Sequence, residues 1–530
     1  MNILKKTFLL VGLAACLLVR ADNSENPYHY LYKDLPFEMP VVHAPVFSGR
    51  QLLITETGGV GDGITLNTTA FEEAMSRLEA AGGGTLLVPF GVWHTGPIVL
   101  RSNIRLHLEK GALILFTSDR KAYPLIKTVY EGQETFRCQS PISGKNLVNI
   151  AITGKGTING SGESWRPLKR PKVTEAHWKE VVASGGVLKN KEFWFPSEGA
   201  LKAELMVEQN GGMPTKNMTV SDWEEIRDYL RPVMVSLVSC KNVLLQGVLF
   251  ENSPSWNIHP LMCENIIVDG VFIRNPAYAQ NGDGLDLESC KNAIVVNSVL
   301  DVGDDAICLK SGKDEEGRLR ARPTENVIVD NCTVFKGHGG FVVGSEMSGG
   351  VRNVSVSNCN FIGTDVGLRF KSTRGRGGVV ENIFINNISM LDIRTDSFLF
   401  DLYYATRGEQ SDIQPVSEAT PIFRNIYVKN LVSRNAGRAM FFNGLPEMNI
   451  TNINVENASI TARLGAELSE SDGVSFRNVH VTPDEGPAFL LNNVKNFRSA
   501  GLSYPEGMIN PIDVKGGKNI QVVQNRIIEN

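Results

Sequence analysis

The 530-residue sequence lacks several features that would assign it to common functional classes. Its 53 Lys and Arg are outnumbered by 57 Asp and Glu, so no general basic field favours nucleic-acid binding. No Cys/His set has the spacing of zinc ligands, and no Gly-rich loop has a phosphate-binding pattern. No apolar run is long enough to span a membrane. We therefore expect a monomer with no metal, no cofactor, no nucleic-acid partner and no membrane span.

Cysteine is also scarce, with eight residues in the chain. Two lysines and the short apolar run 7–19 predict a signal peptide over residues 1–21, and hence export to the periplasm or beyond. The run also fits a lipoprotein box at Cys16, but the apolar residues after that Cys favour cleavage near Ala21. Without Cys16 seven cysteines remain, several in equivalent repeat positions, which favours stacked free thiols over disulfides.

The sequence is rich in one recurring pattern, an Asn followed by a short β-branched strand. Copies begin at Asn242, Asn265, Asn292, Asn326, Asn353, Asn382, Asn425, Asn449, Asn478, Asn496 and Asn519. Repeats of this length indicate a solenoid built from coils of strands. A β-sandwich is the alternative, but it would not hold Asn in one position through eleven copies. We predict an all-β, right-handed parallel β-helix in which the Asn side chains form a structural hydrogen-bonded ladder.

The remaining segments predict a cap, an N-terminal extension and an insertion in the solenoid. The pattern over residues 68–81 predicts a short helix that caps the N-terminal end of the β-helix. We expect an N-terminal extension over 22–50 and a catalytic β-helix over 51–530. Residues of about 160–232 interrupt the repeat and hold four of the six tryptophans, so this insertion either builds a binding face or packs as a surface loop.

Four consecutive pieces of the chain align on Ser289, Ser311, Ser345 and Ser372. Two residues before each Ser lies an apolar side chain, and because strand side chains alternate, the residues one and three before it point outward. Stacked at about 4.8 Å, the pieces bring unusual polar residues onto neighbouring rungs. These residues are Asp283, Asp304, Asp305, His338, Arg369 and Lys371, with Lys310 in the outward column and His259 in the preceding segment.

Paired acids of this kind can cleave a glycosidic bond, one as proton donor and the other by activating water or attacking carbon. Asp304 and Asp305 are adjacent, and a turn at Gly303 can let both reach the groove. A solvated turn would explain this pair alone, but not three acids and a His beside two cations. Arg369 and Lys371 can form ion pairs with Glu288 and Asp286, bind a carboxylated substrate, or do both.

Four ordered motifs resemble those of the polygalacturonase family, glycoside hydrolase family 28. They are Asn281-Gly282-Asp283, Asp304-Asp305, Gly337-His338-Gly339 and Arg369-Phe370-Lys371. The resemblance implies inverting hydrolysis of α-1,4-linked galacturonic acid, with Asp304 as general acid and Asp283 and Asp305 activating the water. It implies that His338 supports the acid. The further residues expected to contact pectin oligosaccharides are Arg369, Lys371, Tyr404, His259, Asn281 and Lys310.

The long insertion resembles that of exo-acting bacterial members, so we expect release of galacturonic acid from non-reducing ends. Endo-action, or hydrolysis of modified or branched pectin, is the alternative. A calcium-dependent pectate lyase and a non-catalytic polysaccharide-binding β-helix are the rivals from other classes. For His259 the sequence leaves substrate contact and structural support equally open.

Overall fold

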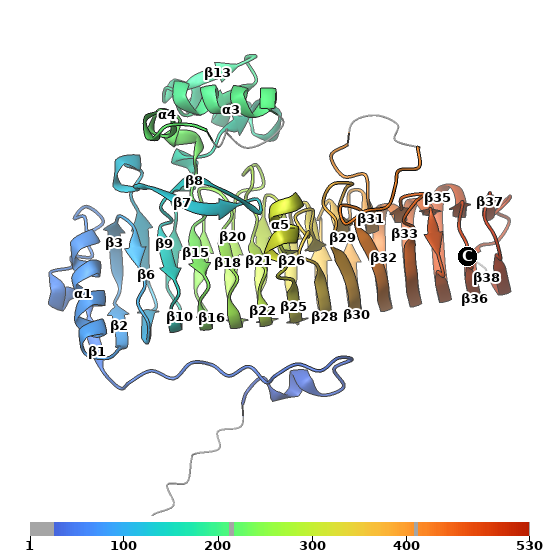
Figure 1. Ribbon diagram of the computed structural model, residues 1–530, viewed down its shortest axis with the longest axis horizontal. Helices are drawn as coiled ribbons and strands as arrows, with labels where there is room; N and C mark the ends of the chain where they lie inside the picture. Colours follow the sequence, from blue (N-terminus) through green and yellow to red (C-terminus); the bar gives the residue numbers. More distant parts are fainter. Residues whose placement is uncertain (1–25, 211–216, 407–411, 529–530) are drawn as a thin grey trace, which may run out of the picture.

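The structure, a computed structural model, describes residues 26–210, 217–406 and 412–528. Thirty-three strands form one continuous parallel sheet that winds into a long solenoid, as Figure 1 shows. The expected parallel β-helix is therefore confirmed. No helix within these described ranges is both long and apolar enough to cross a membrane. The predicted signal peptide, including Cys16, lies outside the described residues.

Each coil adds one strand to the face of the solenoid that we call the active-site sheet. In register order its strands are β9 (Ile142–Lys145), β15 (Val235–Val238), β18 (Ile258–Leu261), β21 (Leu285–Glu288), β24 (Asp305–Lys310), β27 (Gly339–Val343), β29 (Val366–Lys371) and β31 (Asp396–Asp401). The alignment made on the four serines is confirmed, because Asp286, Cys308, Val342 and Arg369 are register partners on consecutive strands.

The other strands complete the coils. A second face contains β2 (Gly84–Val88), β5 (Ile104–Leu108), β10 (Val148–Gly154), β16 (Lys241–Gln246), β19 (Glu264–Asp269), β22 (Lys291–Val296) and β25 (Thr324–Asp330). A third contains β3 (Gly91–Thr95), β6 (Ala112–Phe116), β11 (Thr157–Asn159), β17 (Leu249–Glu251), β20 (Phe272–Arg274), β23 (Val299–Val302) and β26 (Thr333–Lys336). In later coils one long strand covers both of these faces, as in β28 (Val351–Ile362) and β30 (Val379–Leu391). The strands β32 (Ile422–Asn443), β33 (Ile450–Ser469) and β35 (Ser475–Asn492) also continue the active-site sheet beyond β31.

The interior is filled by apolar side chains, including the predicted inward column Leu287, Leu309, Val343 and Phe370. Phe370 packs with its ring centroid 4.8 Å from that of Phe400, in an aromatic stack below the later part of the active-site sheet. The seven cysteines are free and buried, as expected of stacked thiols. These fully buried rows fix the position of each active-site strand in the solenoid, because a closely packed core resists displacement.

The predicted Asn ladder is present at the start of β16 and of the strands stacked on it, where Asn242 and Asn265 are the second residues of their strands. Asn242, for example, donates to Asn149 at 2.9 Å and accepts from Asn265 at 3.0 Å, each with positive φ. The ladder differs from the expectation at two coils. Asn452 rather than Asn449 donates to Asn425, and Asp472 rather than Asn478 accepts from Asn496. Asn449 instead donates to the carbonyl of Leu445, and Asn478 belongs to a second Asn ladder on another turn.

The predicted capping helix is α1 (Thr68–Ala80), which buries Phe71, Met75 and Leu78 against the first coils. Residues 26–48 run back along the outside of the solenoid. There Tyr28 and Val42 cover an apolar stripe formed by outward residues of the second face: Ala151, Leu244, Ile267, Ile294, Val296 and Ile328.

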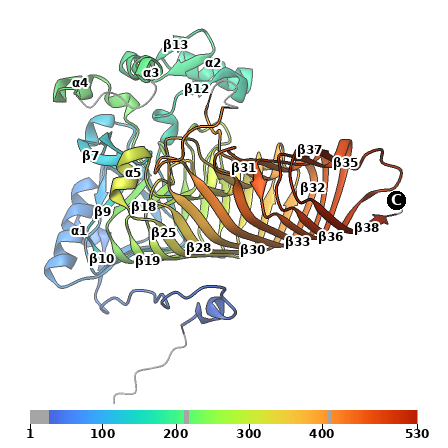
Figure 2. The same ribbon diagram turned by 45° about the vertical axis from the view of Figure 1, so that its right-hand side comes forward.

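Two segments project from the edge of the active-site sheet, as Figures 1 and 2 show. One is an antiparallel hairpin of β7 (Leu125–Tyr130) and β8 (Gln133–Cys138), which the repeat pattern did not predict. The other lies within the insertion expected at 160–232 and contains β12 (Leu168–Lys169), α2 (Glu175–Ala183), β13 (Val187–Lys189), β14 (Phe193–Phe195), α3 (Glu198–Asn210) and α4 (Val220–Glu225). The hairpin and insertion pack together where Phe136 meets Trp223, with ring centroids 5.2 Å apart.

Candidate active site

Three carboxylates converge at the start of β24. One oxygen each of Asp283, Asp304 and Asp305 lies within 4.8 Å of the others. Asp305 is the first residue of β24, and Asp304 precedes the strand, where the backbone does not yet alternate. The Gly303 turn therefore does allow both acids to reach the same point. The three groups could also share a divalent cation, but two protein cations compete with such an ion for Asp305.

Asp305 is the buried member of the cluster that is paired with two cations. Arg369 Nη1 donates to its Oδ1 at 2.9 Å and Lys371 Nζ to its Oδ2 at 2.6 Å. Burial disfavours the carboxylate, but Lys371 and Arg369 outweigh burial and hold the pKa of Asp305 well below its usual range. Gly339 makes room for this arrangement, because a Cβ there would lie 3.2 Å from Arg369 Cδ.

Asp304 is the accessible acid. Its side chain is 20% exposed, whereas that of Asp305 is 2% exposed. His338 Nδ1 lies 3.0 Å from Asp304 Oδ1, and the backbone N–H of His338 donates to the Asp304 carbonyl at 2.9 Å. The hydrogen bond to Asp304 raises the pKa of His338, against the opposing effect of burial. Asp304 therefore favours the protonated imidazole of His338 at the open side of the cluster.

Asp283 and Asp286 form the buried acidic side of the site. Burial raises the pKa of Asp283 well above its usual range, and the neighbouring Asp304 raises it further. Burial also raises the pKa of Asp286, to about 7, although Lys310 partly offsets this effect. Lys310 Nζ lies 3.4 Å from Asp286, 3.8 Å from Asp283 and 3.2 Å from Glu346. Lys310 is thus buried among acids rather than open to the groove.

The other predicted residues have definite positions. Tyr404 lies over the two cations, with its ring centroid 4.9 Å from Lys371 Nζ and 5.7 Å from Arg369 Cζ. Asn281 accepts a hydrogen bond from Arg231 at 2.8 Å. His259 is 2% exposed and lies 2.9 Å from Glu288, a setting that fits structural support.

The ion pairs differ from one sequence alternative. The sequence offers Glu288 and Asp286 as ion-pair partners of Arg369 and Lys371, but both cations bind Asp305. Arg320, in the short helix α5 (Asp314–Arg320), pairs with Glu288 at 2.7 Å instead.

The hairpin β7–β8 covers the site on the side of the earlier coils. Tyr130, at its tip, packs against Trp256 with centroids 4.7 Å apart and shares a 2.7 Å hydrogen bond with Ser255. Gly132, also at the tip, is so close to the segment after β24 that a Cβ there would lie 2.5 Å from Lys313 N. The hairpin therefore bridges the coil before the acids and the segment that follows β24.

Comparison with known proteins agrees with this geometry. The family described as "Glycosyl hydrolases family 28" matches this chain over residues 224–483. A solved exopolygalacturonase structure from Thermotoga maritima is 32% identical in sequence and superposes with a TM-score of 0.66. The match covers 79% of this chain and 89% of the Thermotoga maritima chain. The chain belongs to glycoside hydrolase family 28. The protein is therefore a glycoside hydrolase.

Curated relatives of the hydrolase include a probable polygalacturonase of Vitis vinifera, 29% identical over 82% of this chain and 81% of its own. An exo-poly-alpha-D-galacturonosidase of Dickeya chrysanthemi is 28% identical over 72% of this chain and 62% of its own.

Sequence reasoning missed several residues around the hydrolase's acids. Glu346 directly follows Ser345 in the aligned frame, and Trp256 lies inside the segment 253–260, so both could have been found from the register. Trp256 packs under Lys310, whose Nζ is 4.4 Å from the ring centroid. Tyr130 of β7 and Arg320 of α5 lie outside the repeat, where no periodic signal connects them to the site.

Proposed function

We propose that this hydrolase cleaves α-1,4-linked galacturonic acid in pectin. The observation that carries the proposal is a convergence of three carboxylates directly beside two cations under an aromatic ring. Arg369 pairs with Asp305 through Nη1, and its side chain is still 15% exposed, so part of the guanidinium remains open to a substrate. A uronate carboxylate is the sugar substituent that such a cationic position favours. The printed names of the relatives, polygalacturonase and exo-poly-alpha-D-galacturonosidase, support the same substrate.

Asp304 is proposed as the general acid. It is the exposed member of the cluster and therefore the one that can reach the oxygen of a glycosidic bond. His338 shares a proton with it over 3.0 Å and can return that proton after each turnover. General acid catalysis by a positioned group contributes typically about 10²–10⁴-fold to the rate.

A water molecule rather than a protein carboxylate is proposed as the nucleophile, which gives inversion. Both oxygens of Asp305 are held by Arg369 and Lys371, and this makes Asp305 a poor direct nucleophile. Asp283 and Asp305 are proposed to hold the attacking water between them, with Asp283 as its proton acceptor, because their carboxylate oxygens converge on one point. The oxygens lie within 4.8 Å, closer than the roughly 6.5–9.5 Å typical of inverting enzymes, so product stereochemistry must be measured.

The proposed action is exo, from the non-reducing end. The hairpin β7–β8 closes the groove on the side of the earlier coils, where Tyr130 and Trp256 stack. The insertion reinforces this side, because His177 of α2 lies 5.3 Å from Tyr278 in the segment leading to Asp283. A groove closed beside the acids leaves room for a chain end but not for a continuous polymer. We also propose export, as the N-terminal sequence predicts.

A product profile tests this proposal. The wild type and Asp304→Asn are incubated with de-esterified polygalacturonate, and sugars are separated by size over time. We expect galacturonic acid alone from the first time point and loss of activity in the variant. A ladder of oligomers would overturn exo-action, and an unsaturated product absorbing in the near ultraviolet would indicate a lyase. Proton NMR of the first product gives its anomeric configuration, and a retained anomer would refute the water mechanism.

A further inference from the structure

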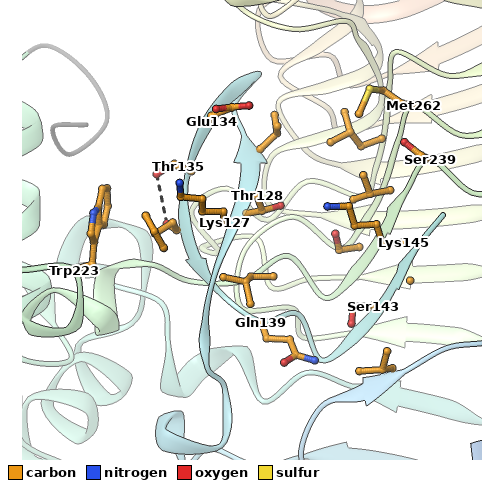
Figure 3. A pocket seen from close by; sticks show the side chains of 18 residues that line it. Lys127, Thr128, Glu134, Thr135, Gln139, Ser143, Lys145, Trp223, Ser239 and Met262 are labelled. Carbon is orange, nitrogen blue, oxygen red and sulfur yellow. Dashed lines mark hydrogen bonds between the residues drawn. The ribbon is translucent and has the colours of Figure 1, made fainter. Parts of the chain in front are cut away.

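A second cavity lies on the active-site sheet, beyond the hairpin from the acids. Its volume is about 750 Å³, within the usual range of roughly 300–1,000 Å³ for small-molecule sites. Its walls are the hairpin, residues of β9, β15 and β18, and Trp223 of the insertion. Figure 3 shows the hairpin in the middle of the view, with Trp223 on one side of it and Lys145, Ser143, Ser239 and Met262 on the other.

The floor of the cavity continues the outward columns of the catalytic site. Lys145 on β9 is in register with Val238 on β15, which is in register with Leu261, and that column leads on to Glu288 and Lys310. Lys145 thus occupies the same column as the cations around the acids, but several rungs earlier. At about 4.8 Å per rung, four rungs separate Lys145 from Lys310 by roughly 19 Å.

The polar lining is open to a ligand. The side chains of Gln139, Ser143, Ser236 and Ser239 make no hydrogen bond with any described residue, and Lys145 forms no ion pair with one. In Figure 3 the Lys145 side chain extends from the sheet toward the hairpin. Lys127 adds a second positive charge, and Glu134 is the one acidic side chain in the lining.

Apolar side chains alternate with these polar groups. Ile126 and Phe136 of the hairpin and Leu261 of the sheet line the same space. Sugars have apolar C–H faces that pack on such surfaces and hydroxyls that need hydrogen-bond partners. A purely apolar ligand would leave the four polar side chains covered and unpaired, which costs free energy.

We propose that this cavity is a second binding site for a short uronic-acid oligosaccharide, distinct from the catalytic groove. A carboxylate pairs with Lys145, and the hydroxyls bind the Ser and Gln side chains. The choice of galacturonate as ligand rests on the proposed function. The site holds the enzyme on its polymer without taking part in cleavage, because the wall of Tyr130 and Trp256 separates it from the acids.

Digalacturonate binding to the Asp304→Asn protein, measured by titration calorimetry, tests this inference. We expect two sites per chain. Adding Lys145→Gln should weaken one of them about tenfold, the typical effect of losing a charge-assisted hydrogen bond. Ser236→Phe, which fills the floor of the cavity, should abolish the same site. Lys155→Gln, a matched change of an exposed lysine outside the cavity, should leave both sites intact.

The contrary outcomes are equally clear. A stoichiometry of one in the parent protein would overturn the second site, as would equal weakening by Lys145→Gln and Lys155→Gln. On the active enzyme, Lys145→Gln should raise KM for the polymer while kcat on trigalacturonate stays within about twofold; a fall in kcat on the trimer would make the cavity part of the catalytic groove. If the wild type fails to hydrolyse polygalacturonate, the proposed function fails, whereas the binding stoichiometry still decides the second site.

Discussion

Replacing Lys371 with Met isolates the charge that holds Asp305 ionised. Lys371 Nζ is 2.6 Å from Asp305 Oδ2, and the two side chains are only 7% and 2% exposed. Removing one partner of a buried pair typically costs about 3–5 kcal/mol, because the remaining charge stays buried. Since Arg369 still binds the other oxygen, we expect a loss in unfolding free energy near the lower end, about 3 kcal/mol.

The pH dependence distinguishes this electrostatic loss from a packing defect. The folded pKa of Asp305 lies below its unfolded value of about 3.9, so its ionisation stabilises the fold above that pH. This stabilisation declines by about 1.4 kcal/mol per unit as the pH falls below about 3.9 toward the folded pKa. The difference between wild type and Lys371→Met should therefore be about 1 kcal/mol smaller near pH ~3 than near pH ~6.

Urea unfolding followed by tryptophan fluorescence at both pH values measures the loss in unfolding free energy and its change with pH. Lys155→Met is the control, because Lys155 is exposed and should show no large loss at either pH. An equal loss at both pH values in Lys371→Met would refute the reasoning, since it would assign the effect to lost packing rather than to the buried charge.

Three further changes probe the rest of the site. Burial raises the pKa of Asp286 to about 7, so its ionisation destabilises the fold progressively between about pH 4 and pH 7. Asp286→Asn should then gain stability relative to wild type on going from pH ~4 to pH ~8, by up to about 4 kcal/mol in urea unfolding, and a pH-independent difference would contradict this. His338→Gln should lower kcat/KM about a hundredfold and remove the fall in activity as pH rises through the pKa of His338, which Asp304 raises; an unchanged alkaline limb in the pH profile would exclude His338 as its origin. Gly132→Val places a Cβ against Lys313 at a residue with φ of 74°, so it should lift the hairpin tip and add oligomers to the products; unchanged products would remove the hairpin from the basis of exo-action.

The register of the site followed from the sequence because the coils are strictly periodic. Aligning Ser289, Ser311, Ser345 and Ser372 places the acids and cations on consecutive strands, and the strand register agrees. The β-helix permits only this register, because a shift of one residue would turn every apolar side chain of a strand outward. Asn449 shows the limit, because neighbouring Asn residues compete for one position and the pattern cannot decide between them.

The ion-pair partners could not be predicted in the same way. A Lys or Arg side chain is longer than the spacing of about 4.8 Å between rungs, so register alone does not fix which acid it reaches. Lys310 forms an ion pair with Asp286, and Arg320 forms one with Glu288. Lys371 and Arg369 pair with Asp305 instead. The hairpin tip at Tyr130 was unpredictable for a different reason. Its contact with Trp256 joins residues far apart in the chain, and no repeat relates them.

Because the site residues come from different coils, the spacing of the coils fixes the spacing of these residues along the groove. Asp304 with Asp305, His338, and Arg369 with Lys371 come from consecutive coils, so their separation along the groove is graduated in steps of about 4.8 Å by main-chain hydrogen bonds. A single substitution can change what a rung recognises, but it cannot change how far that rung lies from the acids. A longer or shorter reach along the sugar chain requires the gain or loss of a whole coil.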